Sequence, residues 1–476
     1  MPEHRASSPG DRPARLFLAA AAVFLIAASL YAKTVTFEFQ TEWDDGGYVE
    51  NNPKLVDLDL GNLTALLTEP VMKTYHPVQM LSYAFDRMIW GMDPAGFHLT
   101  NVILHALNSV LFLLVLSRLG VGRLLLLVAG ALLFAVHPVH SEAVSWIAER
   151  KTLLAAFFVL LSFLLYARHL ERPSQRVLIA SLTCFLLAVF SKPSVIGFPI
   201  VLAVHEYTSG TLARSSLFRL ALFAIPSVAQ FLITLQLNRN WLDATATNPV
   251  DLDLLLGTVY PTMSVVYWKY GLSLFWPAGL NAYYDPTRYT GFDDPVVLIA
   301  TIALAVVILV ALFGCGRRVR FWSVWTIAFF LPYAQIIPHN AIIMADRYLY
   351  LPSMGIVAIL LLGLRHLASA MGGTIGHRAE SSHTLVTSCA LGIALLLASL
   401  TWSRTEVWRD ESSLWQRTAT QSPNAYIPRL NLGVVYHKRG AYEAARREYL
   451  AAFRLWPNDQ VRRLLRTLPE RGQGDR

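Results

Sequence analysis

The run VLIATIALAVVILVALF occupies residues 297–313 and contains no charged side chain. Two more uncharged runs lie at residues 16–32 and 97–116. Each approaches the roughly 20 apolar residues that cross a bilayer as a helix. The chain of 476 residues is 54% hydrophobic and only 15% charged, whereas soluble domains carry about 25% charged residues. These features exclude a soluble enzyme and a disordered protein, and they predict a polytopic membrane protein.

The apolar segments predict an all-α bundle with about eleven transmembrane helices. The expected crossings are residues 16–32, 99–117, 122–137, 153–168, 177–191, 194–207, 216–236, 295–314, 321–338, 352–370 and 384–402. A cleaved signal peptide is the competing interpretation of the first run, but we favour an uncleaved helix because the preceding tail is long. Residues 257–276 are also apolar. A twelfth crossing there would place the basic loop 317–320 outside, so we expect an interfacial or re-entrant helix.

Basic residues gather in the short loops that this topology places in the cytoplasm, as the positive-inside rule requires. The net charge of +8 therefore does not indicate nucleic-acid binding. Three cysteines without a spaced pair predict neither a disulfide framework nor a zinc site. We expect a multi-pass protein of the bacterial inner membrane with its N-terminus in the cytoplasm. Its expected parts are a cytoplasmic tail (1–15), a transmembrane domain (16–402) with large exported loops (33–98 and 237–294), and an exported helical region (403–476).

Residues 424–457 match one unit of the tetratricopeptide repeat, a helix–turn–helix motif of about 34 residues. The pattern positions are Leu432, Gly433, Tyr436, Gly440, Tyr442, Ala445, Tyr449, Ala452 and Pro457. Stable arrays need about three such units. We therefore expect a short helical hairpin that leans on the exported loops. A lone amphipathic hairpin is the alternative.

The first exported loop contains the acidic stretch Glu42-Trp43-Asp44-Asp45 and, further on, Tyr75-His76-Pro77. A carboxylate close to a positive cluster can accept a proton from a substrate hydroxyl. Asp44 and Asp45 are therefore the candidate catalytic bases, and we expect Trp43, Tyr75 and His76 to shape a pocket. A solvated loop is the alternative.

A second group of ionisable residues lies between His137 and Lys151, beside the membrane on the exported side. An interfacial helix anchored by Trp146 is the alternative to a functional site. The spacing of its acidic and histidine residues fits no standard zinc helix, so the use of a divalent metal is left open. From this group and from residues 346–348 we expect pocket contributions by His137, His140, Glu142, Trp146, Asp346 and Tyr348.

Four cations are expected at the exported membrane surface, where the positive-inside rule makes them less common. They are Arg150, Lys151, Lys192 and Arg347. Brought together by the fold, they would bind the phosphate of a lipid-linked substrate. Taken singly, each is more often an anchor to lipid headgroups.

Several of these segments resemble the transmembrane and tetratricopeptide repeat (TMTC) family of O-mannosyltransferases and their bacterial relatives, within the GT-C class of membrane glycosyltransferases. The run DRYLYLP at residues 346–352 and the segment 137–151 are the most specific matches. The other matching segments are 43–53, 76–116, 344–355 and 408–411.

The resemblance implies a GT-C bundle and a polyprenyl- or dolichyl-phosphate sugar as donor. It also implies that a carboxylate of the first exported loop, Asp44 or Asp45, is catalytic or binds a metal. The chain departs from eukaryotic members in two respects. It has Ser191-Lys192-Pro193 where they have Ser-Lys-Glu, and it has one repeat where they have many.

The function predicted from the sequence is an inverting glycosyltransferase that moves mannose or a similar hexose to an acceptor hydroxyl on the exported face. The acceptor would be a protein or a glycan, membrane lipids would surround the bundle, and the repeat would offer a site for a protein partner. The lipid-linked sugar is the donor substrate, and the use of a divalent metal as cofactor stays open. The alternatives are a flippase for lipid-linked sugars and a membrane scaffold that uses the repeat for envelope glycan assembly.

Overall fold

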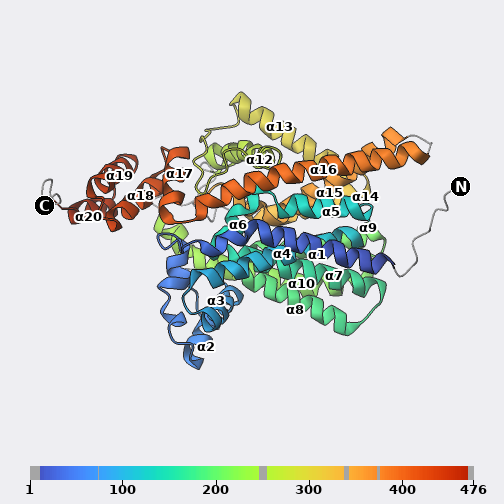
Figure 1. The fold of residues 1–476 in the computed structure, drawn as a ribbon, viewed down its shortest axis with the longest axis horizontal. Helices are drawn as coiled ribbons and strands as arrows, with labels where there is room; N and C mark the ends of the chain where they lie inside the picture. The colour runs from blue at the N-terminus through green and yellow to red at the C-terminus, as the bar shows by residue number, and fades with distance from the viewer. Residues whose placement is uncertain (1–10, 73, 246–254, 337–341, 373–375, 470–476) are drawn as a thin grey trace.

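The computed structural model describes residues 11–72, 74–245, 255–336, 342–372 and 376–469, which form helices and connecting turns without a β-strand (Figure 1). Seven segments of this part are long and apolar enough to cross a membrane. They contain the helices α1 (Asp11–Tyr31), α4 (Pro94–Arg118), α7 (Arg150–Glu171), α10 (Arg214–Thr245), α13 (Pro295–Leu309), α15 (Tyr350–Gly372) and α16 (Gly376–Thr405). The prediction of an all-α polytopic membrane protein is confirmed.

Four shorter helices occupy the other expected crossings: α5 (Leu124–Ala135), α8 (Gln175–Ser191), α9 (Phe198–Ser209) and α14 (Arg317–Phe330). Helix α5 and the segment Pro138–Ser145, which is bent away from it by 46°, make an eighth span if the pair crosses as one broken helix. The other three pack beside longer helices, α8 on α7, α9 on α14 and α14 on α15. A helix of the 12 residues of α9 is about 18 Å long, which is less than the ~30 Å hydrocarbon core. Helix α9 is therefore too short to cross the membrane as a straight helix. The 17 residues of α8 reach the lower limit of about 17 residues for a crossing, and α14 is extended by the turn Leu331–Tyr333.

Local sequence signals define where several helices begin. Asp93 accepts a hydrogen bond from the backbone N–H of Ala95 at 3.0 Å, and Pro94 occupies the first position of α4. Asp294 caps α13 in the same way, through the N–H of Val296 at 2.7 Å. An acidic N-cap followed by proline satisfies one free N–H and fixes the backbone for the first turn.

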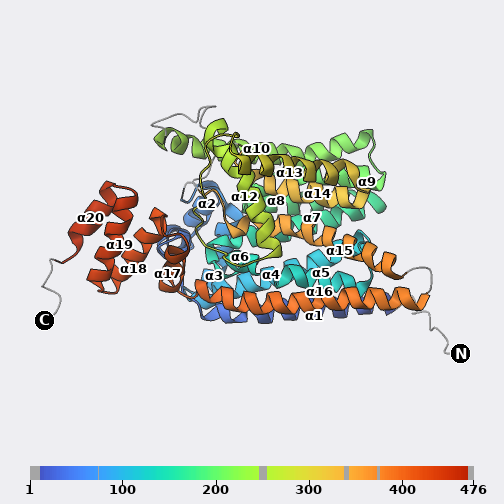
Figure 2. The ribbon, with the colours of Figure 1, turned by 90° about the horizontal axis from the view of Figure 1, so that it is seen from above.

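The remaining helices of the bundle lie towards one end of it, opposite the N-terminal end of α1 (Figures 1 and 2). They are α2 (Leu60–Thr68), α3 (Pro77–Trp90), α6 (Ser141–Ser145) and α12 (Tyr260–Phe275). We refer to this end as the exported end, following the predicted topology. Figure 1 views α12 nearly end-on whereas Figure 2 shows its length, so α12 crosses the direction of the long helices. This orientation suits the interfacial helix expected at residues 257–276.

The C-terminal helices continue beyond the exported end (Figure 1). They are α17 (Glu411–Gln421), α18 (Tyr426–Lys438), α19 (Tyr442–Leu455) and α20 (Asp459–Thr467). Helices α18 and α19 form the expected hairpin. A Cβ atom on Gly433 would lie only 2.5 Å from the ring of Tyr449, so glycine is required for this close approach of the two helices.

Short 3-10 and π-helical turns connect these elements. They are Ala32–Thr36, Gly46–Glu50, Pro53–Leu55, Pro138–His140, Ile147–Glu149, Pro193–Val195, Leu255–Val259, Val310–Gly314, Leu331–Tyr333, Asp346–Leu349 and Glu406–Trp408. Several of them carry the polar residues of the exported end. Such turns set the direction of individual side chains independently of helical periodicity.

Candidate active site

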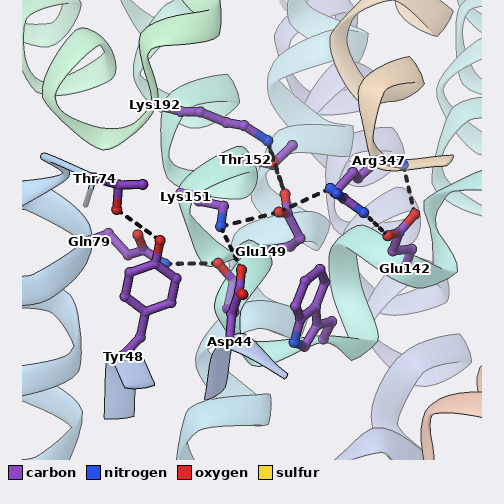
Figure 3. A network of polar contacts seen from close by, with 12 residues as sticks. Asp44, Tyr48, Thr74, Gln79, Glu142, Glu149, Lys151, Thr152, Lys192 and Arg347 are labelled. Atoms are coloured by element: carbon purple, nitrogen blue, oxygen red, sulfur yellow. Dashed lines mark hydrogen bonds and ion pairs between the residues drawn. The ribbon is translucent and has the colours of Figure 1, made fainter. Parts of the chain in front are cut away.

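Three acidic and three basic side chains meet at the exported end, brought there by separate parts of the chain (Figure 3). The first exported loop, the bent segment after α5, the start of α7, the end of α8 and the turn before α15 each contribute. We call this group the charged cluster. It consists of Asp44, Glu142, Glu149, Lys151, Lys192 and Arg347.

Glu149 lies at the centre of the charged cluster and its side chain is only 1% exposed. Its carboxylate is 3.0 Å from Lys192 Nζ, 3.4 Å from Lys151 Nζ and 3.4 Å from Arg347 Nε. The hydroxyl of Thr152 donates to the same carboxylate. Buried charges are stable only when paired and hydrogen-bonded, and Glu149 fulfils this condition with three cations at once.

Asp44 is the most solvent-accessible acid of the charged cluster, with 28% of its side chain exposed. Its Oδ2 atom is 3.6 Å from Lys151 Nζ, and the ring of Tyr48 lies 5.0 Å from the same ammonium group. One carboxylate of the charged cluster therefore combines a cationic neighbour with access from outside, which is the arrangement a general base requires.

Arg347 joins the charged cluster to a second carboxylate. Its guanidinium group forms an ion pair with Glu142, and its backbone N–H donates to Glu142 Oε2 at 3.0 Å. The ring of Trp146 lies 5.4 Å from the guanidinium carbon. When the three carboxylates of the charged cluster are ionised, they balance its three cations, so the cations are held in place without an excess of positive charge.

Lys192 reaches the charged cluster from the end of α8 and donates to Thr152 Oγ1 at 2.7 Å. Burial lowers the pKa of Lys192, while the nearby Glu149 carboxylate opposes that shift. The ring of Tyr333 lies 5.6 Å from its Nζ atom. Its buried position, between an acid and an aromatic ring, is suited to stabilising an additional anion, because charges interact more strongly away from water.

Asp45 lies outside the charged cluster although it follows Asp44 in the chain. Its side chain is fully buried. One carboxylate oxygen accepts the backbone N–H of Gln40 at 2.9 Å, and the other accepts that of Ala148 at 2.7 Å. Burial raises the pKa of Asp45 to about 7, against the two backbone hydrogen bonds. Asp45 thus ties the first exported loop to the segment before α7.

Arg150 is likewise separated from Lys151. It is fully buried and its Nη1 atom is 2.5 Å from Asp86 Oδ2. The guanidinium also donates to Asn101 Oδ1 at 3.0 Å and to the carbonyl of Phe97 at 2.8 Å. The structure therefore brings three of the four expected phosphate-binding cations together and places Arg150 in a closed site of its own.

Two of the expected pocket residues belong to a stack of four indole rings, which we call the tryptophan junction. The ring centroid of Trp146 is 4.4 Å from that of Trp43 and 5.7 Å from that of Trp408. Trp43 also lies 4.9 Å from Trp415. The tryptophan junction joins the first exported loop, the segment before α7 and helix α17 in one apolar core.

The expected histidines lie in different places. Burial, together with the nearby positive charges of Lys151 and Lys192, lowers the pKa of His76 to about 3. His137 is engaged on both nitrogens, with the carbonyl of Leu274 at 3.0 Å and the N–H of Val139 at 3.2 Å. His140 is buried among aromatic rings, 4.6 Å from Phe134. Only His76 thus lies beside the charged cluster.

The other expected pocket residues make separate contacts. Tyr75 donates its hydroxyl to the carbonyl of Leu67 at 2.8 Å. Asp346 accepts the hydroxyl of Tyr284 at 2.5 Å. Tyr348 stacks on Tyr333 with ring centroids 4.0 Å apart, and its ring lies 5.0 Å from the Arg347 guanidinium. Tyr348 therefore lines the charged cluster directly.

Among the described residues no group of three or more histidine, cysteine or acidic side chains is placed to hold a metal ion. The carboxylates of the charged cluster instead face lysine and arginine side chains.

Sequence reasoning did not single out Glu149, Thr152 or Tyr48 as site residues. Glu149 directly precedes the pair Arg150-Lys151, and Thr152 directly follows it. This pattern places an acid and a hydroxyl on either side of two cations, at the exported start of an apolar helix. It is a signal that would have identified Glu149 and Thr152. Tyr48 lies four residues after Asp44, but no pattern distinguishes it from other loop tyrosines.

No known protein-family profile matches the chain. Among named proteins it is 26% identical to Protein O-mannosyl-transferase TMTC4 of Homo sapiens, over 91% of this chain and 66% of the relative. It is 26% identical to Protein O-mannosyl-transferase Tmtc1 of Drosophila melanogaster, over 78% of this chain and 53% of the relative. The chain thus spans between about half and two thirds of the length of these relatives.

A shorter stretch is more similar to a third relative. Protein O-mannosyl-transferase TMTC3 of Homo sapiens is 37% identical over 128 residues, which are 26% of this chain. The similarity to TMTC4 and Tmtc1 covers most of the chain and therefore includes most of its apolar helices. The resemblance expected from the motifs is confirmed: over most of its length this multi-pass membrane protein is similar to proteins named as TMTC O-mannosyl-transferases.

Proposed function

We propose that the protein is a membrane glycosyltransferase. It moves a hexose, with mannose as the first candidate, from a polyprenyl-phosphate donor to an acceptor hydroxyl on the exported face. The names of the relatives support transfer of mannose to a protein. The observation that carries the proposal is the position of Asp44, an accessible carboxylate 3.6 Å from Lys151 in a cluster with two further cations.

In the proposed reaction Asp44 accepts the proton of the acceptor hydroxyl as the acceptor oxygen attacks the anomeric carbon of the sugar. The bond between that carbon and the phosphate oxygen breaks, and its electron pair leaves with polyprenyl phosphate. The phosphate gains a negative charge in this step. Lys151, Lys192 and Arg347 stabilise this charge, so a single base is sufficient and no strong general acid is needed.

Attack from the face opposite the phosphate inverts the anomeric configuration, because one displacement occurs at the reacting carbon. Asp45 and Arg150 take no part in the proposed reaction. They hold the first exported loop and the start of α7 in position, and that position presents Asp44 and Lys151 to the substrate. Trp146 and Tyr348 form apolar walls beside the cations.

The test is transfer by the purified protein with a panel of polyprenyl-phosphate sugars, with and without a chelator. We expect transfer from the mannose donor and, for Asp44→Asn, a rate lower by about 10²- to 10⁴-fold. Asp57→Asn is the matched control because Asp57 is an exposed acid in the same loop. Unchanged transfer by Asp44→Asn would refute the role of Asp44, and a product with retained anomeric configuration would refute single displacement.

A further inference from the structure

A second cavity at the exported end contains a different set of cations. Its volume is about 530 Å³, and it lies between the end of α16, the turn Glu406–Trp408 and α17. We call it the arginine cavity because Arg404, Arg409 and Arg417 line it. Among the described residues that line it, none belongs to the charged cluster. The two sites are therefore separate.

Arg404 is the buried cation of the arginine cavity, with only 10% of its side chain exposed. Its buried Nε and Nη2 atoms make no hydrogen bond. The nearest acid is Asp346, whose Oδ2 atom is 3.8 Å from Nη2, and Asp346 already accepts the hydroxyl of Tyr284. A buried guanidinium with unused N–H groups is costly unless a further acceptor is supplied. An oxyanion in the arginine cavity would supply it.

The other charges around the arginine cavity leave it positive. The acid in its lining, Glu406, is 2.8 Å from Lys33 Nζ. Arg409 forms an ion pair with Asp410 at 3.1 Å, whereas Arg417 is exposed and forms no ion pair with a described residue. Arg404, on α16, and Arg417, on α17, therefore remain available to bind an anion in the arginine cavity.

The surroundings of the arginine cavity place it at the depth of lipid headgroups. Leu400, on the α16 wall, is 42% exposed, and Trp402 close by is 50% exposed. Trp276, next to the lining residue Pro277, is 69% exposed. Exposed tryptophan at the end of a membrane helix is typical of the membrane–water interface. Lipid phosphates lie at this depth, and guanidinium groups bind phosphate with paired hydrogen bonds.

We propose that the arginine cavity is a binding site for a phosphate group carried on a lipid, separate from the site of the donor phosphate. Arg404 and Arg417 bind the phosphate, and Leu400 contacts the adjoining acyl or prenyl chain. This site does not depend on the proposed transfer reaction. Its two phosphate-binding residues, Arg404 and Arg417, belong to α16 and α17, and neither forms an ion pair with a described residue of the charged cluster.

The test is calorimetric titration of the full chain, in a maltoside detergent, with dioctanoyl phosphatidic acid as the phosphate-bearing lipid. Removing one charge-assisted contact to phosphate should weaken binding about 10-fold to 100-fold. We expect this loss for Arg404→Gln and for Arg417→Gln. Arg462→Gln is the matched control, since Arg462 is a half-exposed cation on α20. Lys192→Gln tests the charged cluster and should leave binding in the arginine cavity within about twofold.

Two further titrations distinguish the source of the phosphate. Dioctanoyl glycerol, which lacks the phosphate, and inorganic phosphate, which lacks the lipid, should each bind at least 10-fold more weakly than the phosphatidic acid. Equal affinity for either compound overturns the proposal, as does loss of binding in Lys192→Gln alone or unchanged binding in both arginine variants. Should Arg404→Gln fail to fold, Arg417→Gln still decides, because Arg417 is an exposed residue.

Discussion

Asp44 and Asp45 are neighbours in the chain, as are Arg150 and Lys151, but the two members of each pair lie in different surroundings. Asp45 and Arg150 are fully buried and their polar atoms are occupied by fixed partners. Asp44 and Lys151 belong to the charged cluster, where Asp44 is 28% exposed. One residue of each pair is thus held by fixed partners, and its neighbour belongs to the charged cluster, where we propose that the substrate binds.

This comparison separates two consequences of removing a charge. In a closed site the remaining partner becomes an uncompensated buried charge, so the fold is strongly destabilised. In the charged cluster several opposite charges remain, so loss of one should change function more than stability. The comparison can be tested because each pair supplies its own control one residue away.

The largest difference in stability is expected between the variants Arg150→Gln and Lys151→Gln. Arg150→Gln leaves Asp86 buried without its cation, which should cost about 3–5 kcal/mol of stability. Lys151→Gln leaves Glu149 paired with Lys192 and Arg347. It should change stability much less and lower the rate of transfer about 10-fold to 100-fold. Thermal unfolding in detergent and the transfer assay measure the two effects.

A similar loss of stability in both variants would contradict the distinction between the two sites. Arg150→Lys provides a further check. A lysine keeps the charge beside Asp86 but cannot reproduce the contacts of the guanidinium to Asn101 and Phe97. We therefore expect its stability to lie between those of the unchanged protein and Arg150→Gln.

The next largest loss of stability is expected from a substitution in the tryptophan junction. Trp415 is fully buried and its ring lies 4.9 Å from that of Trp43, the residue before Asp44. Replacing a buried tryptophan by alanine typically costs about 3–5 kcal/mol. Trp415→Ala should therefore destabilise the exported end and also lower transfer, because it removes support for the loop that carries Asp44.

Trp456→Ala is the matched control for Trp415→Ala. Trp456 also lies in the C-terminal region, but 64% of it is exposed, and such surface changes usually stay within about 0.5 kcal/mol. Equal transfer by the unchanged protein and Trp415→Ala would show that the C-terminal helices do not support the site. A chain ending after Trp402 would lose both Trp408 and Trp415, so we expect little transfer from it.

The fold was largely predictable from the sequence because apolar runs of the right length leave few alternatives to membrane helices. The count of full crossings was harder to predict. Helix α9 covers 12 residues where 194–207 was expected to cross, because glycine and proline at its start interrupt the helix. Composition alone does not show where a helix ends inside an apolar segment.

The candidate site was predictable as a group of segments but not residue by residue. Motifs identified the stretches that carry the acids and the cations. The direction of each side chain depends on the short turns Gly46–Glu50 and Ile147–Glu149, where helical periodicity does not apply. This is why Arg150 could not be separated from Lys151, and why Glu149 was not recognised as the central acid.

The pH dependence of stability tests the closed surroundings of Asp45. Burial raises its pKa from 3.8 to about 7. Between these two pH values the folded protein keeps a proton on Asp45 that the unfolded chain has lost. The contribution of Asp45 to stability is therefore complete below about pH 4 and is lost as the pH rises through 7. The slope should be on the order of 1 kcal/mol per pH unit.

Melting temperatures of the unchanged protein and Asp45→Asn, measured from pH 4.5 to 8, isolate this contribution from those of other groups. The difference between the two proteins should shift in favour of Asp45→Asn as the pH rises and become constant above about pH 8. A difference that does not depend on pH would contradict the titration of Asp45 in this range.

The smallest effect is expected where the C-terminal hairpin meets the first exported loop at the surface. Lys438, on α18, forms an ion pair with Glu42, and 51% of the Lys438 side chain is exposed. Exposed ion pairs contribute about 0–1 kcal/mol, so Lys438→Gln should lower the melting temperature only slightly, and less in high salt. Glu411 is only partly exposed and accepts the backbone N–H of Glu42 at 2.5 Å. Glu411→Ala removes this acceptor, whose oxygen a glutamine would keep. It should therefore have the larger effect on transfer, because this contact holds the backbone two residues before Asp44.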